Sequence, residues 1–411
     1  MSKLDELINE LCPDGVEYKK LGEICNVKSG GTPKKNKIEY WEKGTIKWLG
    51  SSVCKNEKFV ASITNYITEE GLNNSSTKLF GKNTTLIALV GATIGKVSYL
   101  QFEASINQNI AALYPKDLNY LNSDYLFYSC QILYKKFLNL ANSGFAMASL
   151  SFVRNLYIPI PPLPIQEEIV RILDTFTELT AELTAELTVE LTARKKQYEY
   201  YRDKLLNFDD SVEWKELGEI STEMYRGAGI KRDQVTPDGI PCVRYGEIYT
   251  KYNIWFEKCF SHTTKDVIKN KKYFEYGDVL FAITGESVEE IAKSCVYVGN
   301  KKCLAGGDMV VMKHEQNPKY LAYALSTTNA RIQKSKGRVK SKVVHSNVDA
   351  IKKIKIPVPP LAEQERIVKI LDKFDTLTND ITKGLPAEIE ARQKQYEYYR
   401  DKLLTFKEKK A

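Results

Sequence analysis

The sequence predicts an α+β protein made by internal duplication, with two mixed α/β domains separated by two long antiparallel helices and related by a pseudo-two-fold axis. Two observations lead to this prediction. Long segments of the first half recur nearly unchanged in the second half, and each copy ends in a long amphipathic helical pattern. With 411 residues the chain exceeds one ordinary core, and its 43% of hydrophobic residues is enough for packed interiors.

The duplication is visible in three pairs of segments. They are VEYKKLGEI from Val16 and VEWKELGEI from Val212, IPIPPLPIQEEIVRILDTF from Ile158 and IPVPPLAEQERIVKILDKF from Ile356, and ARKKQYEYYRDKLLNF from Ala193 and ARQKQYEYYRDKLLTF from Ala391. Matches of this length do not arise from composition, and a period of about 200 residues is too long for a solenoid. The residues between these segments differ almost completely, so a shared framework surrounds two dissimilar domains.

We therefore divide the chain into four segments. A first domain with an N-terminal helix covers residues 1–157, a central helical spacer 158–210, a second domain 211–355 and a distal helical spacer 356–411. Both spacers open with a proline-rich joint, which is expected to be extended and stiff.

The central spacer predicts one long helix. Apolar residues recur at three- and four-residue steps from Ile165, and no Gly or Pro interrupts the pattern up to Phe208. A helix with a single apolar stripe needs a partner, and because the distal spacer can supply one, we expect an antiparallel pair. In the distal spacer, Gly384 and Pro386 predict a kink or a short break.

A short repeat occupies the middle of the central spacer. After Leu179 the sequence contains Thr-Ala-Glu-Leu twice and then Thr-Val-Glu-Leu once. A leucine at every fourth position keeps one face apolar, with a drift of about 40° per unit. Because one unit more or less leaves the helix intact and changes its length by about 6 Å, the repeat is interpreted as an adjustable spacer. A helical filler produced by replication slippage is the alternative, and the two interpretations are compatible.

Composition and motifs exclude several classes of function. The eight cysteines form no CxxC pair, and with three histidines they offer no zinc spacing and fit a reducing cytoplasm. The N-terminus lacks the apolar run of a signal peptide, and no stretch of about 18 apolar residues could span a membrane. The segment from Gly91 to Lys96 imitates a phosphate-binding loop but is one residue short, so a turn between strands is expected. We predict no catalytic residue and no metal site.

The framework motifs resemble a known family. Two variable domains divided by duplicated helices, with PIPPLPIQEEIVRIL and PVPPLAEQERIVKIL, resemble the specificity subunit of type I restriction–modification enzymes. The Thr-Ala-Glu-Leu repeats and ARKKQYEYYRDKLL are most similar to the group called type IC. The resemblance implies that each variable domain is a target-recognition domain for one half of a split, asymmetric site in double-stranded DNA.

The same resemblance implies partner subunits. The helices are expected to set the gap between half-sites and to dock two modification subunits, which methylate adenine with S-adenosylmethionine. Two restriction (motor–nuclease) subunits then complete the endonuclease. The chain itself is expected to be non-catalytic and to bind no cofactor, because S-adenosylmethionine, ATP and Mg belong to the partners.

Other classes of function remain open from the residues alone. A cytosolic coiled-coil scaffold with protein-binding end domains shares the helical pattern. A nuclease or a methylase acting alone is a third class. The methylase would need an (N/D)PP(Y/F) tetrad and a Gly-rich cofactor loop, which the sequence lacks. The net charge of +8 permits a polyanionic partner without requiring one. Salt-dependent binding to DNA would separate a scaffold from a DNA-recognition subunit.

Basic residues in both domains are candidates for DNA contact. Five of them alternate with small residues from Lys334 to Lys342, and on an extended strand they share one face, where an anion is a natural complement. A solvated surface is the alternative. Basic residues also follow a Gly-Pro turn in the first domain and two glycines in the second. The predicted DNA contacts are Lys34, Lys35, Asn36, Lys37, Lys96, Lys231, Arg232, Arg244, Lys334, Lys336, Arg338, Lys340 and Lys342.

The repeated ends of the helices are candidate docking surfaces for the modification subunits, since the same partner must meet both copies. A helix cannot place Tyr198 and Tyr200 on one face, so some of the repeated tyrosines are expected to pack the helix pair instead. The predicted partner contacts are Tyr198, Tyr200, Tyr201, Arg202, Tyr396, Tyr398, Tyr399 and Arg400.

Overall fold

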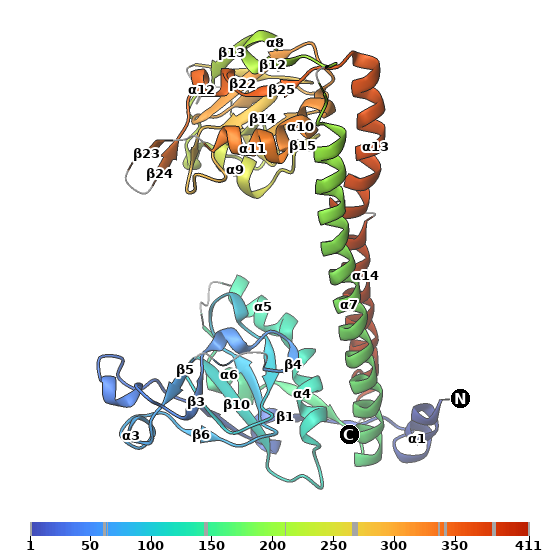
Figure 1. Ribbon diagram of the computed structural model, residues 1–411. Helices are drawn as coiled ribbons and strands as arrows, with labels where there is room; N and C mark the ends of the chain where they lie inside the picture. Colours follow the sequence, from blue (N-terminus) through green and yellow to red (C-terminus); the bar gives the residue numbers. More distant parts are fainter. Residues whose placement is uncertain are drawn as a thin grey trace. The chain divides into compact units, whose positions relative to one another are not determined.

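The structure is a computed structural model that describes residues 2–60, 63, 65–143, 147–209, 211–264, 270–335, 338–340, 343–379 and 384–409. For residues 338–340, 343 and 379 it describes the backbone alone. The chain forms two compact units (Figure 1). Unit 1 consists of residues 1–185 and 390–411, and unit 2 of residues 186–389.

Unit 1 contains three sheets. A five-stranded sheet has the order β2-β10-β7-β8-β4, a four-stranded sheet the order β5-β3-β9-β6, and β1 pairs with β11. The strands are β1 (Glu17–Lys20), β2 (Cys25–Ser29), β3 (Ile46–Leu49), β4 (Glu57–Phe59), β5 (Asn65–Ile67), β6 (Leu79–Phe80), β7 (Thr85–Ala88), β8 (Val97–Tyr99), β9 (Ala104–Ile106), β10 (Ile110–Pro115) and β11 (Tyr157–Ile160).

Unit 2 repeats this topology strand for strand. Its sheets have the orders β13-β22-β18-β20-β15, β16-β14-β21-β17 and β12-β25. The strands are β12 (Trp214–Glu216), β13 (Ser221–Arg226), β14 (Ile240–Val243), β15 (Trp255–Phe256), β16 (Ser261–Thr263), β17 (Tyr273–Phe274), β18 (Val279–Ala282), β20 (Ser294–Tyr297), β21 (Cys303–Ala305), β22 (Met309–His314) and β25 (Lys355–Pro357). A further sheet of β19 (Thr284–Gly285), β24 (Val343–His345) and β23 (Arg338–Lys340) is added to this set.

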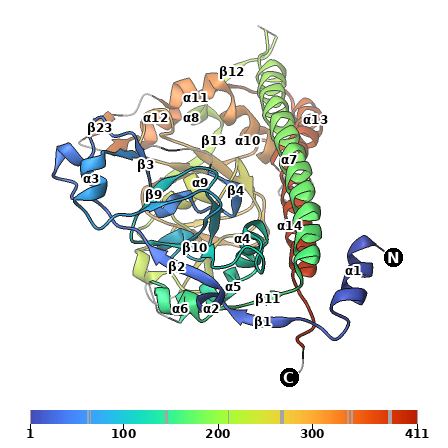
Figure 2. The ribbon, with the colours of Figure 1, turned by 90° about the horizontal axis from the view of Figure 1, so that it is seen from below.

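Short helices cover the sheets. Unit 1 has α1 (Lys3–Leu11), α2 (Leu21–Ile24), α3 (Glu69–Asn73), α4 (Ser123–Gln131), α5 (Tyr134–Asn142) and α6 (Leu150–Arg154), with 3₁₀ turns η1 (Ile38–Tyr40), η2 (Ser51–Val53) and η3 (Gly91–Thr93). Unit 2 has α8 (Leu217–Ile220), η4 (Arg232–Gln234), α9 (Tyr245–Thr250), α10 (Pro318–Ser326), α11 (Thr328–Lys334) and α12 (Val348–Lys352). In unit 1, α4 lies between the five-stranded sheet and the long helix α7 (Figures 1 and 2).

The long helix α7 (Leu163–Leu205) is uninterrupted and supplies residues to both units. In unit 1 it pairs with α14 (Leu385–Leu403), whose Tyr396 hydroxyl lies 3.0 Å from the Thr177 hydroxyl. The pair is antiparallel. Beyond α14, the Lys407 carbonyl accepts the N–H of Val16, the residue before β1. β1 pairs with β11, which leads directly into the start of α7. The end of α14 therefore lies near the beginning of α7.

Unit 2 repeats this arrangement with α13 (Leu361–Asn379). Tyr201 of α7 stacks on Phe374 of α13, with ring centroids 5.7 Å apart. The strand β12 follows α7 and pairs with β25, which precedes α13, so these two helices are also antiparallel. The predicted antiparallel pairing, the α+β class and the duplication are confirmed. The predicted break falls between α13 and α14, and residues 380–383 lie outside the described part of the chain.

A buried glutamine fixes each proline-rich joint. The side chain of Gln166 is fully buried; its amide donates to the carbonyls of Pro161 (2.8 Å) and Tyr120 (3.0 Å), and its oxygen accepts the Asn122 N–H (2.9 Å). Gln364 stands at the same place in unit 2: its amide donates to the Pro359 carbonyl and to the Gln316 side-chain oxygen, and its own oxygen accepts the Asn317 N–H. Tyrosine hydroxyls from α4 and α10 reach the same joints: Tyr125 bonds to Pro159 and Tyr320 to Pro357. Side-chain hydrogen bonds therefore hold the proline-rich joint against its domain in both copies.

We predict that Gln166→Ala lowers the free energy of unfolding by about 1–3 kcal/mol, because it removes the side-chain partner of the buried Pro161 carbonyl and of two part-buried backbone groups. Urea denaturation followed by circular dichroism measures the change. The matched control is Gln393→Ala on the exposed surface of α14, which should change the midpoint little. Equal effects of the two substitutions would show that the Gln166 contacts contribute nothing to stability.

Candidate functional site

The basic loop of unit 1 is anchored at its base. A Cβ on Gly30 would lie 1.8 Å from the Ile106 carbonyl oxygen, so only glycine fits this approach to β9. The Gly31 N–H bonds to the same carbonyl at 2.9 Å, and the buried Trp48 donates from Nε1 to the Gly31 carbonyl at 3.0 Å. Trp41 then donates to the Lys34 carbonyl at 3.1 Å. The loop after Gly31 is thus held in one place by its backbone.

This anchored loop presents predicted DNA contacts to solvent. Lys34, Lys35 and Asn36 are exposed. Lys37 is half-buried, and its amine donates to the Tyr40 hydroxyl at 3.1 Å and lies over the Tyr40 ring. Lys34, Lys35 and Asn36 are therefore the side chains of this group that are available to a ligand, whereas Lys37 is partly used to hold the loop.

Unit 2 builds its loop by the same backbone contacts from different residues. A Cβ on Gly227 would lie 1.9 Å from the Gly306 carbonyl oxygen, and the Ala228 N–H bonds to the carbonyl of Ala305 at the end of β21. β21 is the counterpart of β9. Lys231 and Arg232 follow and are exposed. The two predicted basic loops therefore occupy equivalent positions in the two domains.

The basic strip of unit 2 is not one continuous strand, which corrects the sequence prediction. Lys334 ends α11 and its side chain is buried, with the amine donating to Ser294 Oγ (2.8 Å) and to the Leu325 carbonyl (2.7 Å). The prediction was wrong for Lys334, because these contacts turn the side chain inward. Arg338 and Lys340 lie on β23, two residues apart and hence on one face of that strand. Lys336 and Lys342 lie outside the described residues.

The two remaining basic candidates are half-buried. Lys96 follows the turn η3 between the antiparallel strands β7 and β8, which confirms the predicted turn. A Cβ on Gly95 would lie 2.4 Å from Phe137 Cβ, so close packing explains that glycine. Arg244 precedes α9 and its guanidinium lies 3.4 Å from the buried Glu247 carboxylate. Its charge is therefore partly compensated within the domain.

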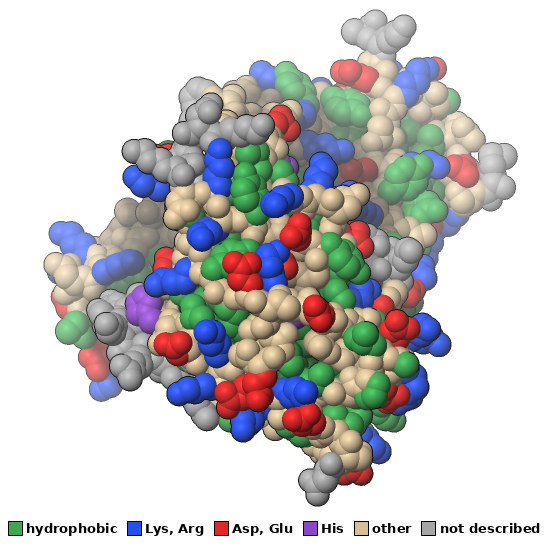
Figure 3. All heavy atoms as spheres, turned by 90° about the horizontal axis from the view of Figure 1, so that it is seen from above, with side chains coloured by type: hydrophobic (Ala, Val, Ile, Leu, Met, Phe, Trp, Pro, Cys, Tyr) green, Lys and Arg blue, Asp and Glu red, His purple; other side chains and the backbone are tan. Residues whose placement is uncertain are grey.

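Charges of both signs share the visible surface. Figure 3 shows Lys and Arg side chains interspersed with Asp and Glu on the face that it presents. This mixture agrees with the small net charge of +8 and points to local basic loops as the sites of anion contact. In the part of the chain that the structure describes, no group of three His, Cys, Asp or Glu side chains is placed to hold a metal ion, and no helix is long and apolar enough to cross a membrane.

The repeated tyrosines divide into buried and exposed positions, as predicted. Tyr198 is buried. Tyr396 is half-buried, and its hydroxyl is hydrogen-bonded to the Thr177 hydroxyl. By contrast, Tyr200 and Tyr398 are 60% and 63% exposed. Their neighbours Tyr201 and Tyr399 are also exposed, although each has a ring contact with a phenylalanine of the paired helix. One exposed tyrosine pair is therefore present on each unit.

The two repeated arginines correct the prediction of partner contacts. Arg202 and Arg400 are buried, and each pairs with the aspartate that follows it, Asp203 or Asp401. Arg400 also lies 3.4 Å from the Gln131 side chain of α4. Together with Tyr198, these arginines hold the helix ends against the domains. The signal was in the spacing, since Arg202 is four residues after Tyr198 and shares its face.

Sequence reasoning also missed a repeated aspartate. Asp174 of α7 accepts the Tyr128 hydroxyl at 2.5 Å, and Asp372 of α13 accepts the Tyr323 hydroxyl at 2.6 Å. These residues occupy matching places in the duplicated segments, LDTF and LDKF. A carboxylate kept beside an apolar stripe was the signal that could have identified them.

Comparisons with known proteins agree on one family. The family model described as "Type I restriction modification DNA specificity domain" matches twice, over residues 13–193 and 210–391. The EcoprrI type I restriction enzyme specificity subunit of Escherichia coli is 33% identical over 408 residues, 93% of each chain. A putative type I restriction enzyme specificity subunit of Haemophilus influenzae is 37% identical over 274 residues, 65% of this chain and 68% of that protein. A chain from a solved type I R-M system superposes with a TM-score of 0.67 at 16% identity, covering 96% of this chain and 98% of that one, which shows the same fold.

The buried Lys334 generates a prediction about pH. Burial, with a smaller contribution from the charge of Arg331, lowers the pKa of Lys334 from its ordinary 10.5 to about 7. Below pH 7 both the folded and the unfolded chain hold the proton, so the full cost of burying the charge is present. Between the two pKa values only the unfolded chain keeps the proton, so the stability of the folded state rises with pH. Lys334→Met should remove this contribution.

We expect the free energy of unfolding of the native chain, relative to Lys334→Met, to increase from pH 6 to pH 9.5. Urea denaturation at several pH values measures it. Lys353→Met, on the exposed end of α12, is the control and should give a difference that is flat with pH. A flat difference for Lys334→Met as well would contradict the buried, neutral amine.

Proposed function

The chain belongs to the family of type I restriction–modification DNA specificity subunits, and from this membership we propose that it recognises a bipartite, asymmetric site in double-stranded DNA. As a specificity subunit it is the DNA-recognition component of a complex and not the enzyme itself. We propose that each unit reads one half-site and that partner subunits then methylate adenine or restrict the DNA.

The observation that supports two-part recognition is a shared topology with dissimilar surfaces. The three sheets of unit 1 and their counterparts in unit 2 have the same strand orders. The loops that follow β2 and β13 are anchored on equivalent strands by equivalent backbone bonds, yet one carries Lys34, Lys35 and Asn36 and the other Lys231 and Arg232. One scaffold presenting two different sets of polar side chains fits the reading of two different half-sites. We assign phosphate contacts to the lysines and arginines, and base contacts to polar side chains near them.

The proposed partners are two modification subunits and two restriction subunits. The exposed pairs Tyr200–Tyr201 and Tyr398–Tyr399 offer the same aromatic surface twice, as the docking of two copies of one partner requires. We place S-adenosylmethionine, ATP and Mg in those partners. The complex is proposed to work in the cytoplasm, where the free cysteines of this chain would stay reduced.

The finer assignment to type IC rests on the Thr-Ala-Glu-Leu repeats. They lie within α7, where Leu187 is buried and the surrounding Glu186, Thr188 and Val189 are exposed. The boundary between the two compact units falls at residues 185 and 186, inside the repeats. We propose residues 158–210 and 356–411 as spacers that set the gap, and residues 1–157 and 211–355 as the two recognition domains.

Double substitution Lys34→Gln/Lys35→Gln tests the DNA contact of unit 1. We expect weaker binding of the complex with its modification subunits to a duplex carrying the recognised site. The slope of log K against log salt should also fall by about 0.9 for each phosphate that the variant no longer neutralises, because fewer counterions are released. Fluorescence anisotropy across a salt series measures both quantities.

Lys135→Gln/Lys136→Gln is the matched control, since it removes two neighbouring exposed lysines from α5 and leaves the loop unchanged. An equal loss of affinity in both double variants would mean that net charge, and not this loop, determines binding. Salt-independent binding of the native chain would favour the scaffold alternative and overturn the proposed function.

Deletion of Thr184–Leu187 tests the spacer. Removing one unit shortens α7 by about 6 Å, which against a rise of about 3.4 Å per base pair predicts a preferred gap shorter by one or two base pairs. Both half-sites should stay the same. Sequencing of methylated adenines in DNA modified by the complex measures the gap, with Glu186→Gln as a control of unchanged length. A methylation map with the original gap would show that the repeats do not set the distance between the half-sites.

A further inference from the structure

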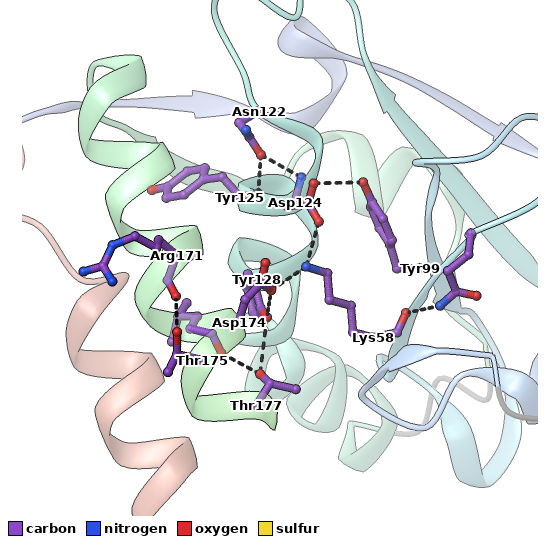
Figure 4. A network of polar contacts seen from close by, with 12 residues as sticks. Lys58, Tyr99, Asn122, Asp124, Tyr125, Tyr128, Arg171, Asp174, Thr175 and Thr177 are labelled. Atoms are coloured by element: carbon purple, nitrogen blue, oxygen red, sulfur yellow. Dashed lines mark hydrogen bonds and ion pairs between the residues drawn. The ribbon is translucent and has the colours of Figure 1, made fainter. Parts of the chain in front are cut away.

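One lysine of unit 1 joins the recognition domain to the long helix. Lys58 lies on the edge strand β4, and its side chain is only 10% exposed. Its amine is 2.8 Å from the Asp124 carboxylate of α4 and forms a second ion pair with Asp174 of α7 (Figure 4). Burial alone would lower the pKa of Lys58, but the two carboxylates outweigh it and raise that pKa. Sheet, domain helix and spacer helix therefore meet at one ammonium group.

The contacts continue across the helix pair. The Tyr128 hydroxyl donates to Asp174 at 2.5 Å and lies 3.3 Å from the Thr177 hydroxyl. Thr177 in turn lies 3.0 Å from the Tyr396 hydroxyl of α14. A chain of polar contacts thus runs from β4 through α4 and α7 to α14. We call Lys58, Asp124, Asp174, Tyr128, Thr177 and Tyr396 the Asp174 network.

This network adds a second point of attachment to the joint. The joint holds the domain at Gln166, and the network holds it at Asp174, eight residues or about 12 Å further along α7. Between these two points Ile169 and Leu173 of α7 pack in the apolar core of the domain. Apolar packing is non-directional, so polar contacts at two heights on one helix add a directional constraint to it. Lys58 is placed to supply that second constraint.

In unit 2 a lysine also pairs with the repeated aspartate, but this lysine lies on a helix and not on the edge strand. Asp372 takes the place of Asp174 and accepts the Tyr323 hydroxyl. Its cation is Lys319, whose amine is 2.9 Å away. Lys319 lies two residues after the helix cap Asn317 of α10, as Asp124 lies two residues after the cap Asn122 of α4. The edge strand β15 contributes Trp255 instead, and the Lys319 amine lies 4.2 Å from its ring centroid.

We propose that Lys58 and Lys319 are positioning residues: each fixes the direction of its recognition domain on the spacer helix by pairing with the repeated aspartate. Each thereby narrows the range of gaps between half-sites that the complex accepts. The proposal rests on the proposed function. The aspartate belongs to the duplicated framework and its tyrosine partner recurs on α4 and α10 of the two domains, while each domain places its cation on a different element.

The arrangement of unit 2 supplies a rescue experiment for unit 1. Lys58→Met leaves the Asp124 and Asp174 carboxylates without their shared cation, and the domain gains freedom to pivot. Asp124→Lys alone places two cations on one carboxylate. The double variant Lys58→Met/Asp124→Lys copies the unit 2 arrangement, with the cation delivered from the helix, and should restore the contact.

The readout is the distribution of gaps among methylated sites, measured by sequencing a random-gap library of duplexes treated with the full chain and its modification subunits. For Lys58→Met we expect the ratio of methylation at gaps one base pair too long or too short, relative to the preferred gap, to rise about fivefold, the change produced by a loss of ~1 kcal/mol. Asp124→Lys should broaden the distribution as well, and the double variant should return it toward that of the native chain. Lys135→Met, on exposed α5, is the control.

The outcomes separate the possibilities. An unchanged gap distribution for Lys58→Met, with or without a lower melting temperature, would overturn the positioning role, because a purely structural lysine affects stability and total activity only. Failure of the double variant to narrow the distribution while it folds normally would also count against the role. If the native chain itself shows no preferred gap, the proposed function fails, independently of Lys58.

Discussion

The pairing of α7 with two different helices is the constraint on which the rest of the structure depends. A 43-residue helix with one apolar stripe must cover that stripe, and in each unit a C-terminal helix covers its share. Unit 1 consequently needs the last 22 residues of the chain, residues 390–411. Unit 2 is one contiguous stretch of sequence, whereas unit 1 is not, and unit 1 cannot be complete before α14 has been made. The N–H of Lys409 bonded to the Val16 carbonyl closes this long-range contact.

The two sheet systems show how little of a sequence is needed to keep a topology. Residues 25–157 and 221–355 share almost no sequence, but the fully buried strands β7 and β18 occupy the same place with Thr-Leu-Ile-Ala and Val-Leu-Phe-Ala. What is kept is burial on both faces of the central strands, together with a few close backbone approaches such as those of Gly30 and Gly227. The loops between these fixed points carry no such demand. Different recognition surfaces can therefore arise on one scaffold without a change of fold.

The parts predicted correctly from the sequence were those encoded by local periodicity. The span of α7, the two helices on either side of Gly384 and the turn at Gly91 follow from apolar spacing and from Gly and Pro. Side-chain burial was harder. The alternating pattern around Lys334 is typical of a strand, but α11 extends to that residue and its amine finds a carbonyl and a hydroxyl inside the domain. Lys58 could not be linked to Asp174 at all, because 116 residues separate them and only the folded sheet brings them together.

The Lys58–Asp174 ion pair of unit 1 and the Lys319–Asp372 ion pair of unit 2 differ in the element that carries the lysine, and this difference explains how dissimilar domains can share one framework. The framework contributes an aspartate, a glutamine and a proline joint in each copy, and these bond to a tyrosine pair and a helix cap in the domain. The remaining requirement is a single cation, and a lysine side chain is long and flexible enough to deliver it from an edge strand or from the first turn of a helix. The amine must reach one particular carboxylate, so its position in space is fixed. The lysine that carries it can stand at more than one position in the sequence. A recognition domain is therefore free to change most of its residues while it keeps its direction on the helix.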